Sequence, residues 1–276
     1  MTTGMADDRK NIVWIASYPK SGNTWVRFLV CNLVFGLQQS ASALNELAPD
    51  VHELGTDVEL PPTPCFMKTH FSFSPRLPFA AHTAAAIYVV RHPADVLVSN
   101  FHYSRRSGAV AKDSIKQDFD AYVERYLASR GDPRWLGLGV GAWDDNIGSW
   151  ILCEQQFPVL ALRYEDLLEN CAAGAQQICA FLGINRTERE IQEASAGASF
   201  ARMKEIEESD IRNRSLGIFY KPYLQESIGA GLRFMRSGKP GEGGQALSPQ
   251  QQQRLATTFG PVMQQLGYAH VDTLPA

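Results

Sequence analysis

The sequence predicts an α/β fold, a doubly wound parallel sheet of the P-loop-like kind, flanked by helices and forming a single domain over residues 1–276. Three observations lead to this prediction. Short β-prone apolar runs alternate with segments of helical periodicity. The chain's most distinctive polar strings come directly after those runs, where ligands bind in sheets of this type. A length of 276 residues suits one large domain better than two small ones.

We expect four strands. The third candidate is a continuous β-prone run, suited to a parallel strand covered on both faces. The second follows a proline-rich stretch, Pro61–Pro64, which cannot be helix interior. The candidates are the run that begins at Ile12, then Cys65–Lys68, Ala86–Val90 and Val159–Tyr164.

Helices are expected between and after these strands. After the first run, apolar side chains recur at steps of three and four residues: Trp25, Phe28, Leu29, Leu33 and Phe35. Six more segments are predicted as helices: Ala94–Tyr103, Lys116–Ser129, Asp144–Gln156, Glu165–Gly183, Thr187–Ser195 and Ser248–Leu266. Residues 104–115 and 206–245 are rich in glycine, serine and charge, so we expect long, mobile loops that order over a ligand.

Composition excludes several classes of protein. The net charge of −3 gives no global basic field of the kind that binds nucleic acid, so any anion site must be a local cluster. Residues 24–37 are too short to span a bilayer, and the N-terminus lacks a secretory apolar region. We therefore expect a soluble, cytoplasmic protein with no membrane partner. Cys171 and Cys179 share an amphipathic segment and are predicted as core residues, with no metal site.

A phosphate-binding loop is predicted where the first strand ends, at residues 18–25. A strand, a tight turn and a helix start direct unpaired backbone N–H groups at an anion. Lys20 adds an ammonium, and Ser21, Asn23 and Thr24 add short donors. In a nucleoside-triphosphatase loop the lysine follows the second glycine, whereas here Lys20 precedes Gly22.

The string from Tyr18 to Trp25, YPKSGNTW, resembles the 5′-phosphosulfate loop of cytosolic-type sulfotransferases. That family uses 3′-phosphoadenosine 5′-phosphosulfate (PAPS) as donor, and the resemblance implies that Trp25 stacks on the adenine. The alternative is an ordinary strand–turn–helix with a solvated lysine.

A second string, residues 91–103, is similar to the family's 3′-phosphate motif. The resemblance implies that Arg91 and Ser99 both contact the 3′-phosphate of the nucleotide. A guanidinium can bind a phosphate in a bidentate manner, and the hydroxyl adds a neutral donor. Alternatively, Arg91 forms a local ion pair with Asp95.

A third string, residues 234–244, looks like the family's glycine-rich closing loop. The resemblance implies that Arg236 and the backbone amides of Ser237 and Gly238 cover the 3′-phosphate. Ser237 stands where the family has a lysine, a cation that Lys239 could replace. Glu242-Gly243 stands in place of an acidic–aromatic pair.

The family's catalytic base falls at His70, in the string Lys68-Thr69-His70. An attacking hydroxyl must lose a proton, and imidazole has a pKa close to working pH. A structural histidine is the alternative, and His92 and His102 are rival bases.

Two aromatic residues match family positions near the adenine, Tyr164 and Phe200. Aromatic faces on either side of a purine make physical sense, although each residue could equally belong to the core.

Together these strings indicate transfer of a sulfonate from PAPS to a hydroxyl of a small-molecule acceptor, without a metal. Lys20 and the loop amides would stabilise charge on the leaving phosphate oxygen. The amino-acid sequence of these strings looks closest to bacterial members of the sulfotransferase family that sulfate natural products. The alternatives are a P-loop kinase and an inactive nucleotide-binding protein.

Aromatic residues suggest an apolar or phenolic acceptor pocket, with membership of the core as the alternative for half of them. The expected pocket residues are Phe71, Phe73, Tyr103, Trp143 and Phe219, with Phe79, Trp135 and Tyr220 as further candidates. The acceptor's identity is not readable from the sequence, and the oligomeric state stays open, a homodimer included.

Overall fold

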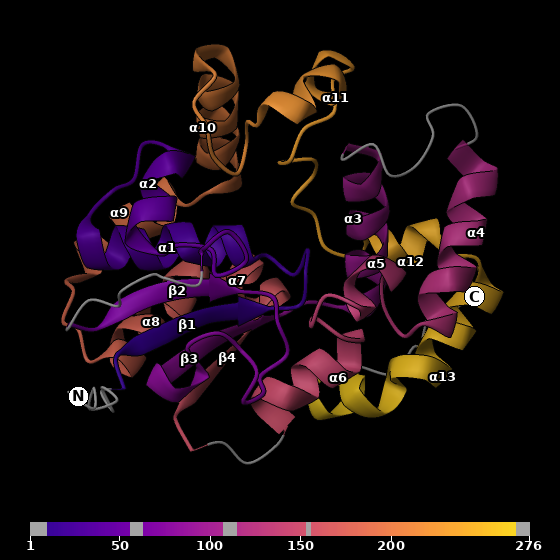
Figure 1. The fold of residues 1–276 in the computed structure, drawn as a ribbon, viewed down its shortest axis with the longest axis horizontal. Helices are drawn as coiled ribbons and strands as arrows, with labels where there is room; N and C mark the ends of the chain where they lie inside the picture. The colour runs from indigo at the N-terminus through magenta and orange to yellow at the C-terminus, as the bar shows by residue number, and fades with distance from the viewer. Residues whose placement is uncertain (1–9, 56–62, 107–114, 153–155, 269–276) are drawn as a thin grey trace, which may run out of the picture.

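The computed structural model describes residues 10–55, 63–106, 115–152 and 156–268, without the side chains of residues 115–118. Its centre is a four-stranded, fully parallel sheet in the order β2-β1-β3-β4 (Figure 1). The strands are β1 (Ile12–Ser17), β2 (Cys65–Thr69), β3 (Thr83–Val90) and β4 (Val159–Arg163). The predicted fold class and the four predicted strands are confirmed.

The register brings the carboxyl ends of the strands to one edge of the sheet. Ala16 of β1 pairs with Thr69 of β2 and with Tyr88 of β3, and Val90 pairs with Arg163 of β4. The residues that follow each strand therefore meet at this edge, which places the polar strings of the sequence close together.

Helices cover both faces of the sheet, because alternate residues of β1 face opposite layers. Val13 and Ile15 pack in one core, whereas Trp14 and Ala16 pack in the other. The first core contains residues of α1 (Asn23–Phe35), α2 (Ala41–Leu47), α8 (Cys171–Leu182), α9 (Glu188–Gly197) and α10 (Phe200–Asn213). The second contains residues of α3 (Pro93–Arg106), α4 (Ile115–Ala128), α6 (Trp143–Ile147) and α13 (Pro249–Gln265). Figure 1 shows α1, α2 and α9 together on one side and α3, α4 and α13 grouped away from them.

Short elements complete the described chain: η1 (Ala80–His82), α5 (Pro133–Leu136), the π-helical turn η2 (Gly148–Leu152), α7 (Tyr164–Glu169), η3 (Pro222–Leu224), α11 (Gln225–Gly229) and α12 (Glu242–Ala246).

Two of the predicted helices are wrong in part. The helix expected over Glu165–Gly183 is two helices, because Asn170 leaves helical geometry and its side chain caps α8 by accepting from the Ala173 amide. The helix expected over Asp144–Gln156 changes to a π-helical turn at Gly148, and residues 153–155 lie outside the described part.

The expected long loops are also shorter than predicted. Residues 206–213 belong to α10, because Met203, Ile206, Glu207 and Asp210 form a buried helical face. Residues 104–106 are the last turn of α3, and residues 107–114 of the other expected loop lie outside the described part.

None of the described helices is long and apolar enough to cross a membrane. Cys179 is buried and Cys171 is half-buried on α8, both as free thiols. Within the described ranges, no cluster of histidine, cysteine and carboxylate side chains could hold a metal ion.

Candidate active site

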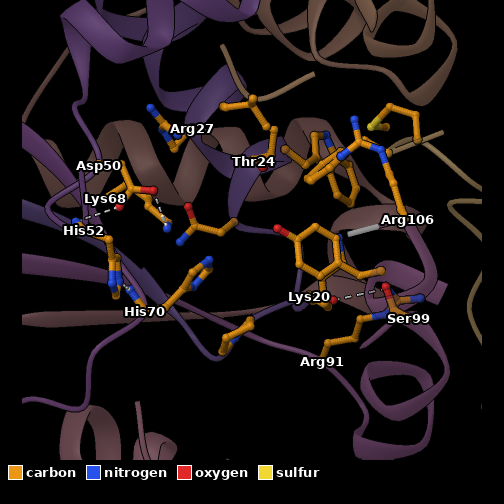
Figure 2. Close-up of a pocket in the computed structure, with 18 of the residues that line it drawn as sticks. Lys20, Thr24, Arg27, Asp50, His52, Lys68, His70, Arg91, Ser99 and Arg106 are labelled. Atoms are coloured by element: carbon orange, nitrogen blue, oxygen red, sulfur yellow. Dashed lines mark hydrogen bonds and ion pairs between the residues drawn. The ribbon is translucent and has the colours of Figure 1, made fainter. Parts of the chain in front are cut away.

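A cavity of about 680 Å³ lies where the strand ends meet. Its walls come from the loop after β1, the residues after β2, α3, and the segments 218–224 and 234–238. Figure 2 shows that Lys20, His70, Arg91 and Ser99, predicted from separate strings, all line it. Sequence reasoning therefore identified residues that the fold brings together.

The loop after β1 has a backbone shape that few sequences tolerate. Lys20 has a φ of 71° and Gly22 a φ of 104°, so both residues adopt a left-handed backbone conformation. A Cβ atom on Gly22 would lie 2.6 Å from the ring of Tyr164, so glycine also permits close packing there. The turn ends at the start of α1, whose first N–H groups have no intrahelical partners.

The Lys20 ammonium lies among aromatic rings and other cations. Its Nζ is 4.1 Å from the ring centre of Phe234 and 4.5 Å from that of Tyr103. Burial lowers the pKa of Lys20 to about 7, helped by the guanidinium groups of Arg106 and Arg91. An anion in the cavity would favour the charged lysine, so this geometry suits an anionic ligand.

The residues that follow Lys20 in the loop have different roles. Gly22, Asn23, Thr24 and Trp25 line the cavity. Ser21 is buried outside the lining, and its Oγ has no hydrogen-bond partner among the described residues. The Asn23 side chain donates to the Ile15 carbonyl and, at 3.3 Å, to Ser17 Oγ, so its amide N–H groups serve the end of β1 rather than a ligand.

Arg91 lies at the end of β3 and is held by backbone carbonyls. It donates to Lys20 at 3.4 Å and to Lys239 at 3.3 Å, and its guanidinium lies 4.3 Å from the ring centre of Tyr164. The alternative ion pair with Asp95 exists, but at 3.7 Å. Among the described residues the buried Nε of Arg91 has no hydrogen-bond partner, so one donor of this guanidinium is left unsatisfied by the protein.

Asp95 is a site residue that the sequence analysis treated only as an ion-pair partner. Its carboxylate accepts from the amides of Gly241 at 2.9 Å and Gly243 at 2.7 Å. It thereby ties the glycine-rich loop to the start of α3.

A second acidic anchor, Glu207 on α10, was missed. It is fully buried and accepts from the amides of Phe234 at 2.6 Å and Met235 at 2.8 Å. A carboxylate on the apolar face of a helix was the signal that could have revealed it.

The glycine-rich loop lies against the cavity, and Arg236, Ser237 and Gly238 all line it. Arg236 and Ser237 both bond to Glu242. Gly238 has a φ of 67°, and a Cβ there would lie 2.4 Å from the ring of Phe200. The exposed Lys239 is outside the cavity lining.

All three aromatic residues predicted near the adenine line the cavity: Trp25, Tyr164 and Phe200. The rings of Trp25 and Tyr164 meet edge to face, with centres 5.3 Å apart.

His70 follows β2, and its ring is oriented by the end of β1. Its Nδ1 lies 2.8 Å from the Ser17 carbonyl and 3.3 Å from Ser17 Oγ. A carbonyl only accepts, so Nδ1 carries the proton and Nε2 presents its lone pair. Burial, followed by the charge of Lys68, holds the pKa of His70 well below its usual range. The imidazole is therefore neutral and can accept a proton.

The backbone of His70 is fixed by two further side chains. Its N–H donates to His52 Nε2 at 2.9 Å, and its carbonyl accepts from Asn146 at 3.0 Å. Asn146 is fully buried, also donates to the Val140 carbonyl at 2.7 Å, and accepts from Tyr88 at 2.6 Å. These contacts place the residues after β2 against α6.

Lys68 also faces the cavity, beside the base. Its Nζ is 2.7 Å from Asp50 Oδ2. Burial lowers the pKa of Lys68 to about 8, against the opposing charge of Asp50. Burial alone would raise the pKa of Asp50, but Lys68 brings it to about 2.

The rival histidines do not lie with His70. His92 lines a separate cavity of about 300 Å³, where its amide donates to Glu165. His102 lies outside the main cavity lining.

Only some of the aromatic residues predicted for the acceptor pocket line the cavity. Phe71, Tyr103 and Trp135 line the cavity. Five other candidates do not: Phe73, Phe79, Trp143, Phe219 and Tyr220. Trp143 and Phe219 are fully buried in the two cores, where Phe219 stacks on Phe28. Phe73 packs against Trp150. Aromatic packing in the cores thus accounts for these side chains.

Comparison with known proteins agrees with the geometry. A family model described as "Sulfotransferase domain" matches residues 10–267. Sulfotransferase 2B1 of Mus musculus is 29% identical over 209 residues, a match that covers 74% of this chain and 58% of the mouse protein. Amine sulfotransferase of Oryctolagus cuniculus is 25% identical over 261 residues, covering 91% of this chain and 80% of the rabbit protein.

Two solved structures share the fold. Retinol dehydratase, in complex with androsterone and inactive cofactor PAP, has a TM-score of 0.69 at 20% identity, covering 97% of this chain and 83% of the other. Mouse sulfotransferase SULT7A1, complexed with PAP, has a TM-score of 0.65 at 22% identity, covering 94% and 84%.

Proposed function

The chain belongs to the sulfotransferase family, and we propose that it transfers the sulfonate group of PAPS to a hydroxyl of a small-molecule acceptor, releasing PAP. One observation carries the proposal. The cationic loop after β1 and the neutral imidazole of His70 face a single cavity, so a phosphosulfate and an acceptor hydroxyl can meet between them. The androsterone and retinol named with the retinol dehydratase structures are hydroxylated small molecules, which supports this acceptor class.

The cavity residues fit a 3′,5′-substituted nucleotide. Arg91, with its unpartnered Nε, and Ser99 would bind the 3′-phosphate. Arg236 and the amides of Ser237 and Gly238 would cover it once Arg236 exchanges Glu242 for the phosphate. The base would lie against the aromatic wall of Trp25, Tyr164 and Phe200.

The 5′ end would lie in the loop after β1. The 5′-phosphate would be held by Lys20, the backbone amides from Gly22 to Thr24 and the Thr24 hydroxyl. When bound, PAPS supplies an activated sulfur whose bond to the phosphate oxygen can break. Lys20 would stabilise the negative charge that grows on that oxygen, an interaction that is strongest in the transition state.

His70 would act as the general base. The acceptor oxygen forms a bond to sulfur as its proton passes to Nε2, and the Ser17 carbonyl stabilises the resulting imidazolium through Nδ1–H. Lys68, oriented by Asp50, would neutralise the transferred sulfonate.

The decisive experiment incubates the protein with sulfur-labelled PAPS and a panel of hydroxylated metabolites, and follows labelled product together with PAP. We expect labelled sulfate esters from the wild-type protein and a loss of roughly 10²–10⁴ in turnover for His70→Ala. Tight PAP binding without transfer to any acceptor would favour the inactive nucleotide-binding alternative. A natural-product acceptor and a cytoplasmic location remain proposals from the sequence.

A further inference from the structure

The charges that line the cavity do not balance. Its described lining holds seven cationic side chains and two carboxylates. The cations are Lys20, Arg27, Lys68, Arg91, Arg106, Lys221 and Arg236, and the carboxylates are Asp50 and Glu53. A nucleotide with a 3′-phosphate and a 5′-phosphosulfate carries a charge of about −4. Arg236 also bonds to Glu242, which lies outside the lining, so the partner of each cation decides which one is left for an acceptor.

Most of the cations outside the predicted phosphate sites already have partners. Lys68 pairs with Asp50 at 2.7 Å, and Lys221 pairs with Glu53. Arg27 donates to two backbone carbonyls at the carboxyl end of α2, where the helix dipole is negative. Lys68 and Lys221 are thus paired with carboxylates, and the Arg27 guanidinium has three acceptors, Asn45 included, although its Nε is also unpartnered among the described residues.

Arg106, the last residue of α3, is different. Its side chain is buried, and the residue is only 4% exposed. Its Nη2 donates to the Phe219 carbonyl at 2.8 Å, but its Nε has no partner, and no carboxylate in the described chain pairs with it. The nearby carboxylate of Glu207 instead serves the amides of Phe234 and Met235. A buried guanidinium without an anion is costly, which indicates an anion supplied from outside.

The surroundings of Arg106 suit an acidic group. The phenols of Tyr103 and Tyr223 line the same part of the cavity, and neither hydroxyl has a hydrogen-bond partner in the described structure. Arg106 follows Ser99 by seven residues on α3, which is about two helical turns or roughly 10 Å along the helix. The guanidinium is thus displaced along α3 from the predicted 3′-phosphate site.

We propose that Arg106 binds a carboxylate of the acceptor, so that the substrates of this protein are hydroxylated carboxylic acids. The planar guanidinium matches a carboxylate, and the two phenols add neutral donors. This inference rests on the proposed sulfonate transfer and names the acceptor class for the same cavity.

The first test measures binding and does not depend on turnover. Protein loaded with PAP is titrated with matched ligands, for example 4-hydroxyphenylacetate and 3-(4-hydroxyphenyl)propionate against their carboxamides. We expect each acid to bind roughly 10–100-fold more tightly than its amide, the usual range for a charge-assisted hydrogen bond. Equal affinity for the acids and the amides would overturn the proposal.

Variants then locate the effect. At about pH 6, where Lys20 is charged with or without Arg106, Arg106→Met should remove the preference for the acid while leaving amide and PAP affinities within about threefold. Arg106→Lys should keep part of the preference. Arg105→Met is the matched control, because Arg105 neighbours Arg106 on α3 but lies outside the cavity lining. A loss of PAP affinity in Arg106→Met would assign the guanidinium to the donor and refute the proposal. If that variant does not fold, the wild-type and Arg106→Lys titrations still decide.

The assay with labelled PAPS separates this inference from the proposed function. Efficient sulfonation of amides and acids alike would support sulfonate transfer and contradict the acidic acceptor. Selective binding of acids without any transfer would support the Arg106 site and contradict the transfer.

Discussion

Binding of PAP should load a proton onto Lys20. Burial and the charges of Arg106 and Arg91 lower the pKa of this lysine to about 7 in the ligand-free protein. A phosphate beside the ammonium favours the charged form and should return the pKa toward its ordinary value near 10. The nucleotide therefore binds best to the protonated lysine, and the protein must take up a proton wherever the free lysine is neutral.

The magnitude follows from the pKa of about 7. At pH 8 about 90% of the free protein carries a neutral Lys20, so PAP binding should take up roughly 0.9 proton. Above pH 7, affinity should fall about tenfold per pH unit, or about 1.4 kcal/mol. Counting the half-protonated state at pH 7, PAP should bind roughly 50-fold more weakly at pH 9 than at pH 7.

Calorimetric titration at pH 8 in two buffers of different ionisation enthalpy measures the proton uptake directly. The phosphates of PAP are almost fully ionised at this pH, because their second pKa is about 6, and they contribute little. Lys20→Met should abolish the uptake, whereas Lys204→Met, at an exposed position on α10, should retain it. The same uptake in wild type and Lys20→Met would refute the reasoning, because the proton would then be bound elsewhere.

Three further predictions concern the base, the closing loop and the support of the base. His70→Ala should keep PAP affinity within about threefold and lower kcat by roughly 10²–10⁴. Because the pKa of His70 lies well below its usual range, the wild-type kcat/KM for acceptor should hold from pH 8 down to about 6.5. Stopped assays over pH check this, and near-normal turnover in the variant would make His70 structural. Gly238→Ala should weaken PAP binding about tenfold, since its Cβ would displace Phe200. Gly241→Ala, with a similar φ of 80° and an open surrounding, is the calorimetric control, and equal effects would contradict a role for Phe200. Asn146→Ala leaves buried carbonyls unpaired and should lower the free energy of unfolding by about 1–3 kcal/mol, measured in urea. An unchanged midpoint would show that other groups replace those bonds.

The sequence predicted the strands well because burial on both faces leaves continuous apolar runs that are easily recognised. Helix ends were harder. The break at Asn170 depends on one side chain capping α8, and an asparagine in an otherwise periodic segment is compatible with a continuous helix. The helix at 206–213 was missed because acidic residues dominate it, although Met203 and Ile206 provide the apolar face that anchors it.

The placement of the candidate site was predictable where a local string carries the chemistry. Lys20, Arg91 and His70 each follow a strand, so the parallel topology alone brings them to one edge. Asp95 and Glu207 accept hydrogen bonds from amides of the glycine-rich loop, which is distant from both in sequence. Such contacts cannot be predicted from a local sequence pattern. Similarly, composition does not distinguish a core aromatic side chain from a pocket wall.

The two halves of the site differ in how firmly they are held. Ser17, at the end of β1, contacts both the phosphate loop and the base: its Oγ accepts from Asn23, and its carbonyl accepts from His70. The phosphate loop and the base are thus both attached to the buried strand β1. The distance between them therefore does not depend on a flexible segment.

The glycine-rich loop is held by carboxylates, and a ligand can compete with one of them for its partners. Arg236 and Ser237 bond to Glu242, so a 3′-phosphate must compete with an existing anion for Arg236. Asp95 and Glu207 meanwhile keep the loop backbone in place through amide hydrogen bonds that involve no phosphate. Nucleotide binding should therefore rearrange the side chains of this loop more than its backbone. The rigid pairing of Ser17 with His70 can then define the line along which the sulfonate moves.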